Sequence, residues 1–218
     1  LYGIALNSNI SKANQIINKH SPMFVYIEEA NEILLEKSIS EGSLSVLNGK
    51  AELKELLNDS NVDVIISAIS GFAGLETTLI AAKTGKVILL ANKESIVVAG
   101  DIILPLAKEY GSTIIPIDSE HNAIFQCLAS EKNTNDVSKI IITASGGPFE
   151  GKKLLDLKDV TQKEALNHPN WDMGSKISID SATLVNKCLE LIEARYLFDL
   201  NEKYFELVIH PQSIIHSI

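Results

Sequence analysis

The sequence predicts an α/β fold, with a doubly wound parallel sheet in the first half of the chain and an α+β domain in the second half. Three observations support this prediction. Short runs rich in Val, Ile and Leu alternate with helical patterns up to Ile117, two of the helical patterns end at Gly85 and Gly111, and the alternation stops near Asp118. Such alternation is typical of a Rossmann-like sheet covered on both faces, whose ligands bind beyond the carboxyl ends of the strands.

The elements of the first half follow from these patterns in chain order. Strands are expected where apolar and β-branched residues run together, at Leu1–Leu6, Met23–Ile27, Ser43–Leu47, Val62–Ile69, Val87–Leu90 and Thr113–Ile117. Helices are expected where apolar residues recur at helical spacing, at Ser11–Lys19, Glu28–Lys37, Ala51–Leu57, Leu75–Thr84 and Ser95–Tyr110. Glycine is common just past a helix end, as at Gly85 and Gly111. Pro105 lies inside the last helix and should break or kink it.

The second half has a different character. A strand is expected at Lys139–Ala144, a long helix at Ser181–Phe198 and a strand at Glu206–His210, whereas Leu166–Lys176 has little periodicity. We therefore expect two domains, residues 1–118 and residues 119–218.

The composition excludes several classes of protein. Hydrophobic residues make up 45% of the 218 residues, which is enough to bury a core, and no apolar run approaches the ~20 residues that cross a bilayer. Acidic residues outnumber basic ones by 28 to 19, which argues against nucleic acid as a partner because a phosphate backbone calls for a basic stripe. Cys127 and Cys188 are expected to be two buried free thiols in a reducing cytosol, with a disulfide as the alternative. We therefore expect a cytoplasmic protein that binds neither membrane nor nucleic acid.

Both ends of the sequence look interrupted. Leu1 is not Met and opens a strand-like run without the charged segment of a signal peptide, and Val208–Ile218 stops within a β-like apolar pattern. We expect a fragment, with a natural short chain as the alternative.

One candidate metal site directly follows a predicted strand. In Asp118-Ser119-Glu120-His121, two carboxylates two positions apart can converge on a hard cation such as Mg²⁺ or Mn²⁺. The alternative is a helix N-cap, in which Asp118 or Ser119 caps and Glu120 favours the positive end of the helix.

A second polar group lies on the long predicted helix. Asn186, Lys187, Glu190 and Glu193 are spaced to share one helix face, and the alternative to a binding site is a solvated face with a Lys187–Glu190 ion pair. The preceding Asp180–Thr183 has the residues of a helix start, which offers free N–H groups to an anion.

Two further segments follow strands. Thr143–Pro148 contains small residues and Ser145, which suit a phosphate as well as an ordinary Gly–Pro turn. In Asn92–Ser95, Lys93 is a candidate catalytic or cofactor-side cation, and a helix cap is the alternative.

The irregular segment His168–Gly174 carries the only Trp of the chain, at position 171. Large amphipathic side chains on such a segment suit a closing flap, and the alternative is a loop that Trp171 anchors in the core. His210 and His216 are expected to be structural.

Taken together, these residues resemble those of the 1-deoxy-D-xylulose-5-phosphate reductoisomerase family along essentially the whole chain. The segments that carry the resemblance are LLANKES (Leu89–Ser95), PIDSEHNAIFQCL (Pro116–Leu128), SGGPF (Ser145–Phe149), HPNWDMGSKISIDSATLVNKCLELIEARYLF (His168–Phe198) and IHPQSIIHS (Ile209–Ser217). The resemblance implies an NADPH-binding Rossmann-like domain followed by an α+β catalytic domain that binds Mg²⁺ or Mn²⁺.

The resemblance also implies roles for individual residues. The metal ligands fall on Asp118, Glu120 and Glu190. Substrate contacts fall on Ser119, Glu120, Ser145, His168, Ser181, Asn186, Lys187 and Glu190, and cofactor contacts on Asn9, Asn92, Lys93, Glu94 and Gly174. Trp171 and Met173 match the flap, and His210 matches the active-site wall without an assigned role. Glu120 is the first candidate for proton transfer, and Lys93 and His168 are further catalytic candidates.

The implied activity is the rearrangement of 1-deoxy-D-xylulose 5-phosphate and its reduction by NADPH to 2-C-methyl-D-erythritol 4-phosphate, in the non-mevalonate isoprenoid pathway. The resemblance also implies a homodimer when the chain is full length. The alternatives are a non-catalytic metal- or phosphosugar-binding domain and an ordinary Rossmann dehydrogenase without metal.

The sequence departs from the family in two places. It lacks the family's first strand with its glycine-rich G-x-T-G-x-x-G loop, and the C-terminal helical domain. Ser8 stands where the family often has Lys or Asp, which weakens the contact to the NADPH 2′-phosphate. We therefore expect the chain as written to bind NADPH poorly, to lack turnover, and to expose Ile and Val beside the missing strand.

Overall fold

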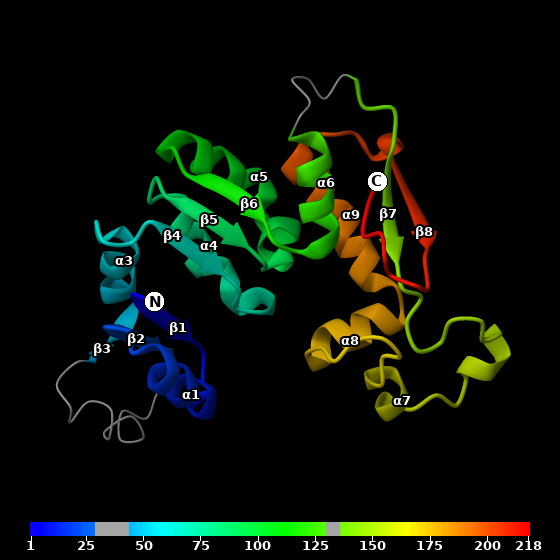
Figure 1. The fold of residues 1–218 in the computed structure, drawn as a ribbon, viewed down its shortest axis with the longest axis horizontal. Coiled ribbons are helices and arrows are strands. Elements are labelled where there is room, and N and C mark those ends of the chain that lie inside the picture. The colour runs from blue at the N-terminus through cyan, green and yellow to red at the C-terminus, as the bar shows by residue number, and fades with distance from the viewer. Residues whose placement is uncertain (29–43, 130–135) are drawn as a thin grey trace. The chain divides into compact units, whose positions relative to one another are not determined.

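The computed structural model describes residues 1–28, 44–129 and 136–218, which form two compact units (Figure 1). The first unit contains Leu1–Ser95 and Ile102–Ile114, and the second contains Ile96–Asp101 and Ile115–Ile218. The boundary between the units follows Ile114, and the second unit also takes Ile96–Asp101 from the helix that precedes this boundary. Each unit is described by itself. The domain assignment at Asp118 stays a prediction.

The first unit is built on parallel strands, as predicted. Strands β1 (Gly3–Leu6), β2 (Phe24–Ile27) and β3 (Ser45–Leu47) pair in parallel in the order β1-β2-β3, and β4 (Val64–Ser67), β5 (Val87–Leu90) and β6 (Thr113–Pro116) form a second sheet in the order β4-β5-β6. The six strands thus form two sheets rather than one continuous sheet, and β1 and β4 are each an edge strand. The edge strand β4 leaves Val64 and Ile66 exposed by 48% and 61%, in accord with the expected exposure of Ile and Val.

The helices of the first unit are α1 (Ile10–His20), α3 (Gly49–Asn58), α4 (Gly74–Ala82) and α5 (Lys93–Tyr110), with a 3₁₀ turn η2 at Gly71–Ala73. The helix predicted at Glu28–Lys37 lies outside the described residues beyond Glu28. Apolar residues of α1, β2 and the segment before β3 form one core cluster, and Ile65, Ala81 and Ile88 form another. Helix α5 is kinked at Ala99, where the backbone leaves helical angles, and the break predicted at Pro105 is wrong. Ala99 lies six residues before Pro105, whereas the proline ring meets the carbonyl four residues before it, so the proline does not explain this kink.

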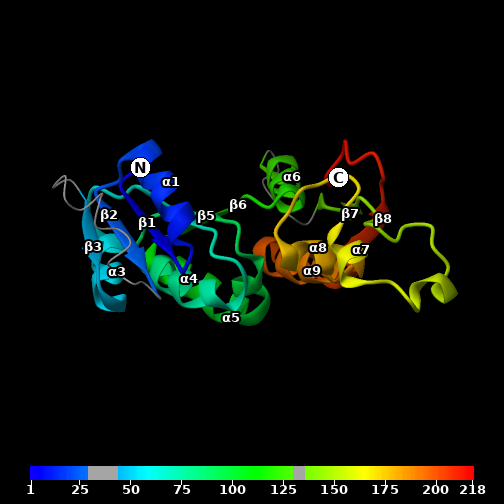
Figure 2. The ribbon, with the colours of Figure 1, turned by 90° about the horizontal axis from the view of Figure 1, so that it is seen from below.

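The second unit contains β7 (Ile140–Ala144) and β8 (Phe205–Ile209), which pair in parallel, and the helices α6 (Ser119–Leu128), α7 (Gln162–Leu166), α8 (Ser175–Ala182) and α9 (Val185–Phe198). Short 3₁₀ turns lie at Leu154–Leu157 (η4) and Glu202–Tyr204 (η5). Helices α6 and α9 contact each other and β7 (Figure 2). The core between them consists of Ile124, Ile140, Ile142, Ala194 and Leu200.

The single helix predicted at Ser181–Phe198 is wrong. Leu184 adopts a left-handed conformation with φ of 61°, which separates α8 from α9. The Thr183 hydroxyl donates to the carbonyls of Ile179 and Asp180 and so closes the last turn of α8. Asp180–Thr183 is therefore a helix end and not the predicted helix start, and Ser181 lies at the C-terminal end of α8.

Two other features bear on the expectations from composition. Cys127 and Cys188 are free, as predicted, but both are exposed rather than buried, because they lie on the outer faces of α6 and α9. Within the three described ranges, no helix combines the length and apolar character that crossing a membrane requires.

Gly100 provides a test of the packing inside the second unit. A Cβ at this position would lie 2.7 Å from Cγ of Tyr196 on α9, so Gly100→Ala should lower the free energy of unfolding by about 1–3 kcal/mol despite the better helix propensity of alanine. Denaturant unfolding measures this loss.

Gly174→Ala is the matched control, since a Cβ there meets nothing within 4 Å. In a Tyr196→Ala background the penalty of Gly100→Ala should disappear. A fully stable Gly100→Ala variant would contradict this close approach.

Candidate metal centre and active site

Three carboxylates meet where α6 begins beside α9. One oxygen each from Asp118, Glu120 and Glu190 lies within 4.8 Å of the others. Asp118 occupies the N-cap position of α6 but makes no capping side-chain hydrogen bond, and Glu120 lies in the first turn. The side chain of Asp118 therefore does not cap the helix. Oxygen donors at this separation suit a hard divalent cation.

The polar face of α9 is buried. Asn186, Lys187, Glu190 and Glu193 are exposed by only 8%, 8%, 1% and 0%, so the solvated-face alternative is wrong although its Lys187–Glu190 pair is present. Lys187 Nζ lies 2.6 Å from Glu190 Oε2 and 2.9 Å from Glu120 Oε1. The Asn186 amide donates to the other Glu190 oxygen. Both predicted substrate contacts on α9 thus touch the predicted metal ligands.

A histidine that sequence reasoning left aside lies behind these carboxylates. His121 is fully buried, with Nδ1 3.3 Å from Asp118 Oδ1 and 3.2 Å from Glu193 Oε2, and with Nε2 2.8 Å from the Glu190 carbonyl oxygen. Burial lowers the pKa of His121, but the contacts with Asp118 and Glu193 outweigh it and raise that pKa to about 9. The ring is therefore a cation at neutral pH.

The cluster brings several carboxylates close together. Its carboxylates are Asp118, Glu120, Glu190 and Glu193, and Lys187, His121 and His216 lie within 3.7 Å of them. Carboxylates that meet this closely repel one another, and a divalent cation bound by their oxygens relieves that repulsion. The residues present therefore fit Mg²⁺ or Mn²⁺.

The glycine-containing turn after β7 lies against the end of α8. Gly146 and Gly147 have φ of 99° and 77°, in the left-handed region that favours glycine. A Cβ on Gly147 would lie 2.9 Å from the Ser181 carbonyl oxygen. This close approach brings the loop of Ser145 beside Ser181, so two predicted phosphate contacts from distant parts of the sequence lie in one place.

His168 is held by the same loop. Its Nε2 lies 3.1 Å from Ser145 Oγ, and its Nδ1 accepts from the backbone N–H groups of Asn170 and Trp171 at 3.1 and 3.2 Å. Burial lowers the pKa of His168. The structure therefore fixes the ring of this predicted substrate contact between the Ser145 loop and the flap segment.

The predicted flap is anchored at both ends but not by its tryptophan. Trp171 is 45% exposed, so the alternative of a loop held in the core by this side chain is wrong. The segment turns at His168 and ends at Gly174, the N-cap of α8, whose carbonyl accepts from the Ser178 hydroxyl. Trp171 and Met173 thus lie on a short irregular segment with fixed ends.

The cofactor candidates of the first unit lie at helix starts. Asn9 caps α1 through Lys12 N–H, and Asn92 caps α5 through Ser95 N–H at 2.9 Å, so the helix-cap alternative for Asn92 is confirmed. The Asn92 amide also donates to the Gly71 carbonyl at 3.0 Å and to Glu94 at 3.3 Å. Lys93 begins α5 and is 6% exposed.

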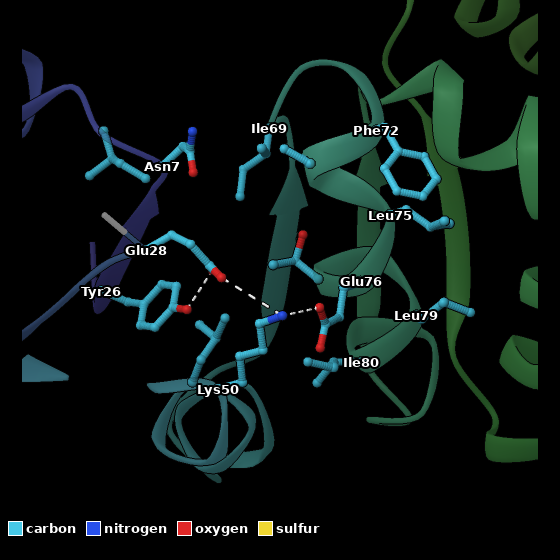
Figure 3. A pocket seen from close by; sticks show the side chains of 14 residues that line it. Asn7, Tyr26, Glu28, Lys50, Ile69, Phe72, Leu75, Glu76, Leu79 and Ile80 are labelled. Atoms are coloured by element: carbon cyan, nitrogen blue, oxygen red, sulfur yellow. Dashed lines mark hydrogen bonds and ion pairs between the residues drawn. The ribbon is translucent and has the colours of Figure 1, made fainter. Parts of the chain in front are cut away.

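A cavity of about 330 Å³ lies at the first unit's strand ends (Figure 3). It reaches Leu6 and Asn7 after β1 and Ile69 after β4. In it, Lys50 pairs with Glu28 at 3.7 Å and with Glu76. The carboxyl ends of parallel strands are where such sheets bind ligands, but none of the predicted cofactor contacts Asn9, Asn92, Lys93 and Glu94 lines this cavity.

Sequence reasoning missed several of these residues. The cavity residues Tyr26, Glu28, Lys50 and Glu76 belong to no motif, and burial with the Glu28 contact raises the pKa of Tyr26 to about 12. His216 was expected to be structural, yet its Nδ1 lies 3.7 Å from Glu120 Oε1. His210 accepts from the Ile214 N–H, which is a local structural contact. His121 follows Asp118 by three positions, a spacing that lets two side chains meet at a helix start, and this was the signal for His121.

The chain was compared with known proteins. Residues 1–100 match the family model described as 1-deoxy-D-xylulose 5-phosphate reductoisomerase, and residues 114–198 match the model of that enzyme's C-terminal domain. The reductoisomerase of Clostridium perfringens strain 13 is 48% identical over 100% of this chain and 57% of the relative.

Solved structures give the same result. A DOX-P reductoisomerase in complex with NADPH, fosmidomycin and magnesium matches with a TM-score of 0.91 and 43% identity over 99% of this chain and 56% of the other. The Zymomonas mobilis reductoisomerase in complex with NADPH matches with a TM-score of 0.87 and 40% identity over 99% and 55%. The chain thus spans a little over half the length of these relatives. The chain belongs to the 1-deoxy-D-xylulose 5-phosphate reductoisomerase family.

Proposed function

We propose that the intact natural protein that carries this sequence converts 1-deoxy-D-xylulose 5-phosphate to 2-C-methyl-D-erythritol 4-phosphate, with NADPH and Mg²⁺ or Mn²⁺, in the non-mevalonate isoprenoid pathway. The observation that carries the proposal is the meeting of Asp118, Glu120 and Glu190, of which one oxygen each lies within 4.8 Å of the others. Family membership supports the same reaction, since relatives carry that name and solved relatives bind NADPH, fosmidomycin and magnesium.

We assign residues 119–218 to a catalytic domain in which Asp118, Glu120 and Glu190 hold the metal. A divalent cation supplies Lewis-acid stabilisation of negative charge on carbonyl and hydroxyl oxygens. Glu120 is the first candidate for proton transfer, because it borders Ser119, Lys187 and His216 at the partly open side of the cluster. Lys93 is a further catalytic candidate.

The phosphate of the substrate is assigned to Ser145, Ser181, Asn186 and Lys187, with Ser119 and His168 as further contacts. The close approach of Gly147 to Ser181 supports this set, because the turn that follows Ser145 reaches the backbone of Ser181. Phosphate binding remote from the reacting carbons uses its free energy to position the substrate. The flap residues Trp171 and Met173 are assigned to closing the site against water.

NADPH is assigned to residues 1–118, through Asn9, Asn92, Lys93 and Glu94, with Gly174 as a further contact from the second unit. The helix starts after β1 and β5 offer N–H groups to phosphate, and the cavity at the strand ends offers space for a nucleotide. The weak NADPH binding of the chain as written, the homodimer and the cytoplasmic location stay predictions.

The two alternatives make different predictions. A metal-free dehydrogenase does not account for the meeting of three carboxylates, and a non-catalytic binding domain gives no turnover. Oxidation of NADPH by the intact protein that requires both the sugar phosphate and Mn²⁺ would exclude both alternatives. Oxidation that is independent of metal, or none at all, would contradict the proposed function.

Glu190→Gln tests the metal ligands. The variant should weaken Mn²⁺ binding roughly tenfold or more and lower turnover with it, because a ligand charge is lost while the side-chain shape is kept. Electron paramagnetic resonance of free Mn²⁺ measures the affinity.

Glu202→Gln is the control, since this carboxylate lies in η5, is 65% exposed and pairs only loosely with Arg195 of α9, at 3.7 Å. An Mn²⁺ titration of Glu190→Gln that matches the wild type would remove Glu190 from the ligand set.

Lys187→Ala tests the phosphate assignment. A charge-assisted contact contributes roughly 1.5–3 kcal/mol, so the KM for the sugar phosphate should rise by about one to two orders of magnitude while NADPH binding stays unchanged. Lys176→Ala is the control, because Lys176 pairs with Asp180 on the outer side of α8. Weaker NADPH binding with an unchanged KM for the sugar would show that Lys187 lies on the cofactor side.

His168 should be a neutral hydrogen-bond donor rather than a base. Its Nδ1 already accepts two backbone N–H groups, so the ring proton lies on Nε2 and is donated to Ser145 Oγ, which leaves the serine hydroxyl to donate to the substrate. Because burial lowers the pKa of His168 below 6.5, its stabilising contribution is present above pH 6.5 and is lost as the pH falls through the lowered pKa.

Nitrogen-15 NMR at pH 7 should therefore show a neutral ring protonated at Nε2. A ring protonated at Nδ1, or a charged ring, would contradict this assignment.

A further inference from the structure

We propose that Glu193 and His121 form a buried positioning pair for the metal site, in which Glu193 holds the His121 ring and the ring fixes Asp118 and the backbone at Glu190. The inference rests on the proposed metal site and adds two residues that neither ligate the cation nor touch the substrate.

The ring of His121 is fixed on three sides. Nε2 lies 2.8 Å from the Glu190 carbonyl oxygen, and Nδ1 lies between Asp118 Oδ1 at 3.3 Å and Glu193 Oε2 at 3.2 Å. The ring also stacks on Phe198, with centroids 6.5 Å apart. Nε2 makes a hydrogen bond with the Glu190 carbonyl, whereas Nδ1 lies within ion-pair distance of both carboxylates without making a hydrogen bond.

Glu193 is not a metal ligand in this arrangement. The carboxylates that meet within 4.8 Å are those of Asp118, Glu120 and Glu190, whereas Glu193 lies one turn further along α9 and is 0% exposed. A carboxylate so deeply buried is costly, and its ion pair with His121 is what offsets that cost.

The pair acts on ligands from two helices at once. Asp118 at the start of α6 contacts the ring through its side chain, and Glu190 on α9 contacts it through its carbonyl. Because Nδ1 lies nearly equidistant from Glu193 and Asp118, the ring connects the Asp118 carboxylate to the buried Glu193 carboxylate. Partners of this kind, which orient metal ligands, typically change metal affinity 10–100-fold when they are lost.

An effect of net charge alone on Mn²⁺ affinity can be separated from an effect of positioning by comparing two variants. Removing the cationic ring in His121→Gln should tighten Mn²⁺ binding if only net charge matters, whereas loss of positioning should weaken it. The double variant His121→Gln/Glu193→Gln removes one positive and one negative charge, so net charge near the ligands is unchanged.

The experiment titrates Mn²⁺ into the wild type, Glu193→Gln, His121→Gln and the double variant, and follows free Mn²⁺ by electron paramagnetic resonance. All three variants should bind roughly 10–100-fold more weakly. In the intact protein, raising Mn²⁺ should restore turnover, which a merely structural defect would not allow. Glu202→Gln, which removes an exposed carboxylate of the same unit, should bind Mn²⁺ like the wild type.

Each outcome decides a different claim. Wild-type affinity in Glu193→Gln and in the double variant would overturn the positioning pair while leaving the metal site intact. Failure of the wild type to bind Mn²⁺ would overturn the proposed metal site itself. If a single variant is too unstable to titrate, the double variant tests the positioning pair, because it removes the charges of His121 and Glu193 together.

Discussion

The structure of the second unit depends on a cluster of charges that α6 and α9 remove from water. Four carboxylates and two cationic side chains lie within this cluster, and Glu190, Glu193 and His121 are almost completely buried. Charges in such a place destabilise the fold unless each is paired. Lys187 joins Glu120 to Glu190, and His121 joins Asp118 to Glu193, so the pairs that make burial tolerable also tie the two helices together. The carboxylates that meet in this cluster are the ligands that we propose for a divalent cation.

The break between α8 and α9 serves the same site. Because Leu184 turns the chain in the left-handed region, α8 can end against the turn after β7 while α9 starts afresh with Asn186 and Lys187 in its first turn. In one continuous helix, Ser181 and Asn186 would lie along a single helix axis. The turn at Gly147 then lies against the Ser181 carbonyl at the end of α8.

The strands and the candidate metal ligands could be predicted from the sequence, because apolar runs and residue types can be read from short segments of the chain. Val87–Leu90 has the predicted bounds, and the three carboxylates were chosen for their residue types and for the family resemblance. The helix break could not be predicted, since apolar spacing continues across Leu184 and periodicity does not report a single left-handed residue. The partnership of His121 with Glu193 depends on how α6 packs on α9, which no local pattern contains. The exposure of both thiols likewise depends on which helix face the fold covers.

Binding of Mn²⁺ to the wild-type protein tests the central claim most directly. Equilibrium dialysis combined with thermal unfolding should show one saturable ion for each chain and a midpoint that rises with Mn²⁺ concentration, because a ligand that binds only the folded state stabilises it. The same concentration of a monovalent salt should give no comparable rise. The absence of saturable binding, or a midpoint that does not respond to Mn²⁺, would contradict the account of the buried charge cluster as a divalent metal site.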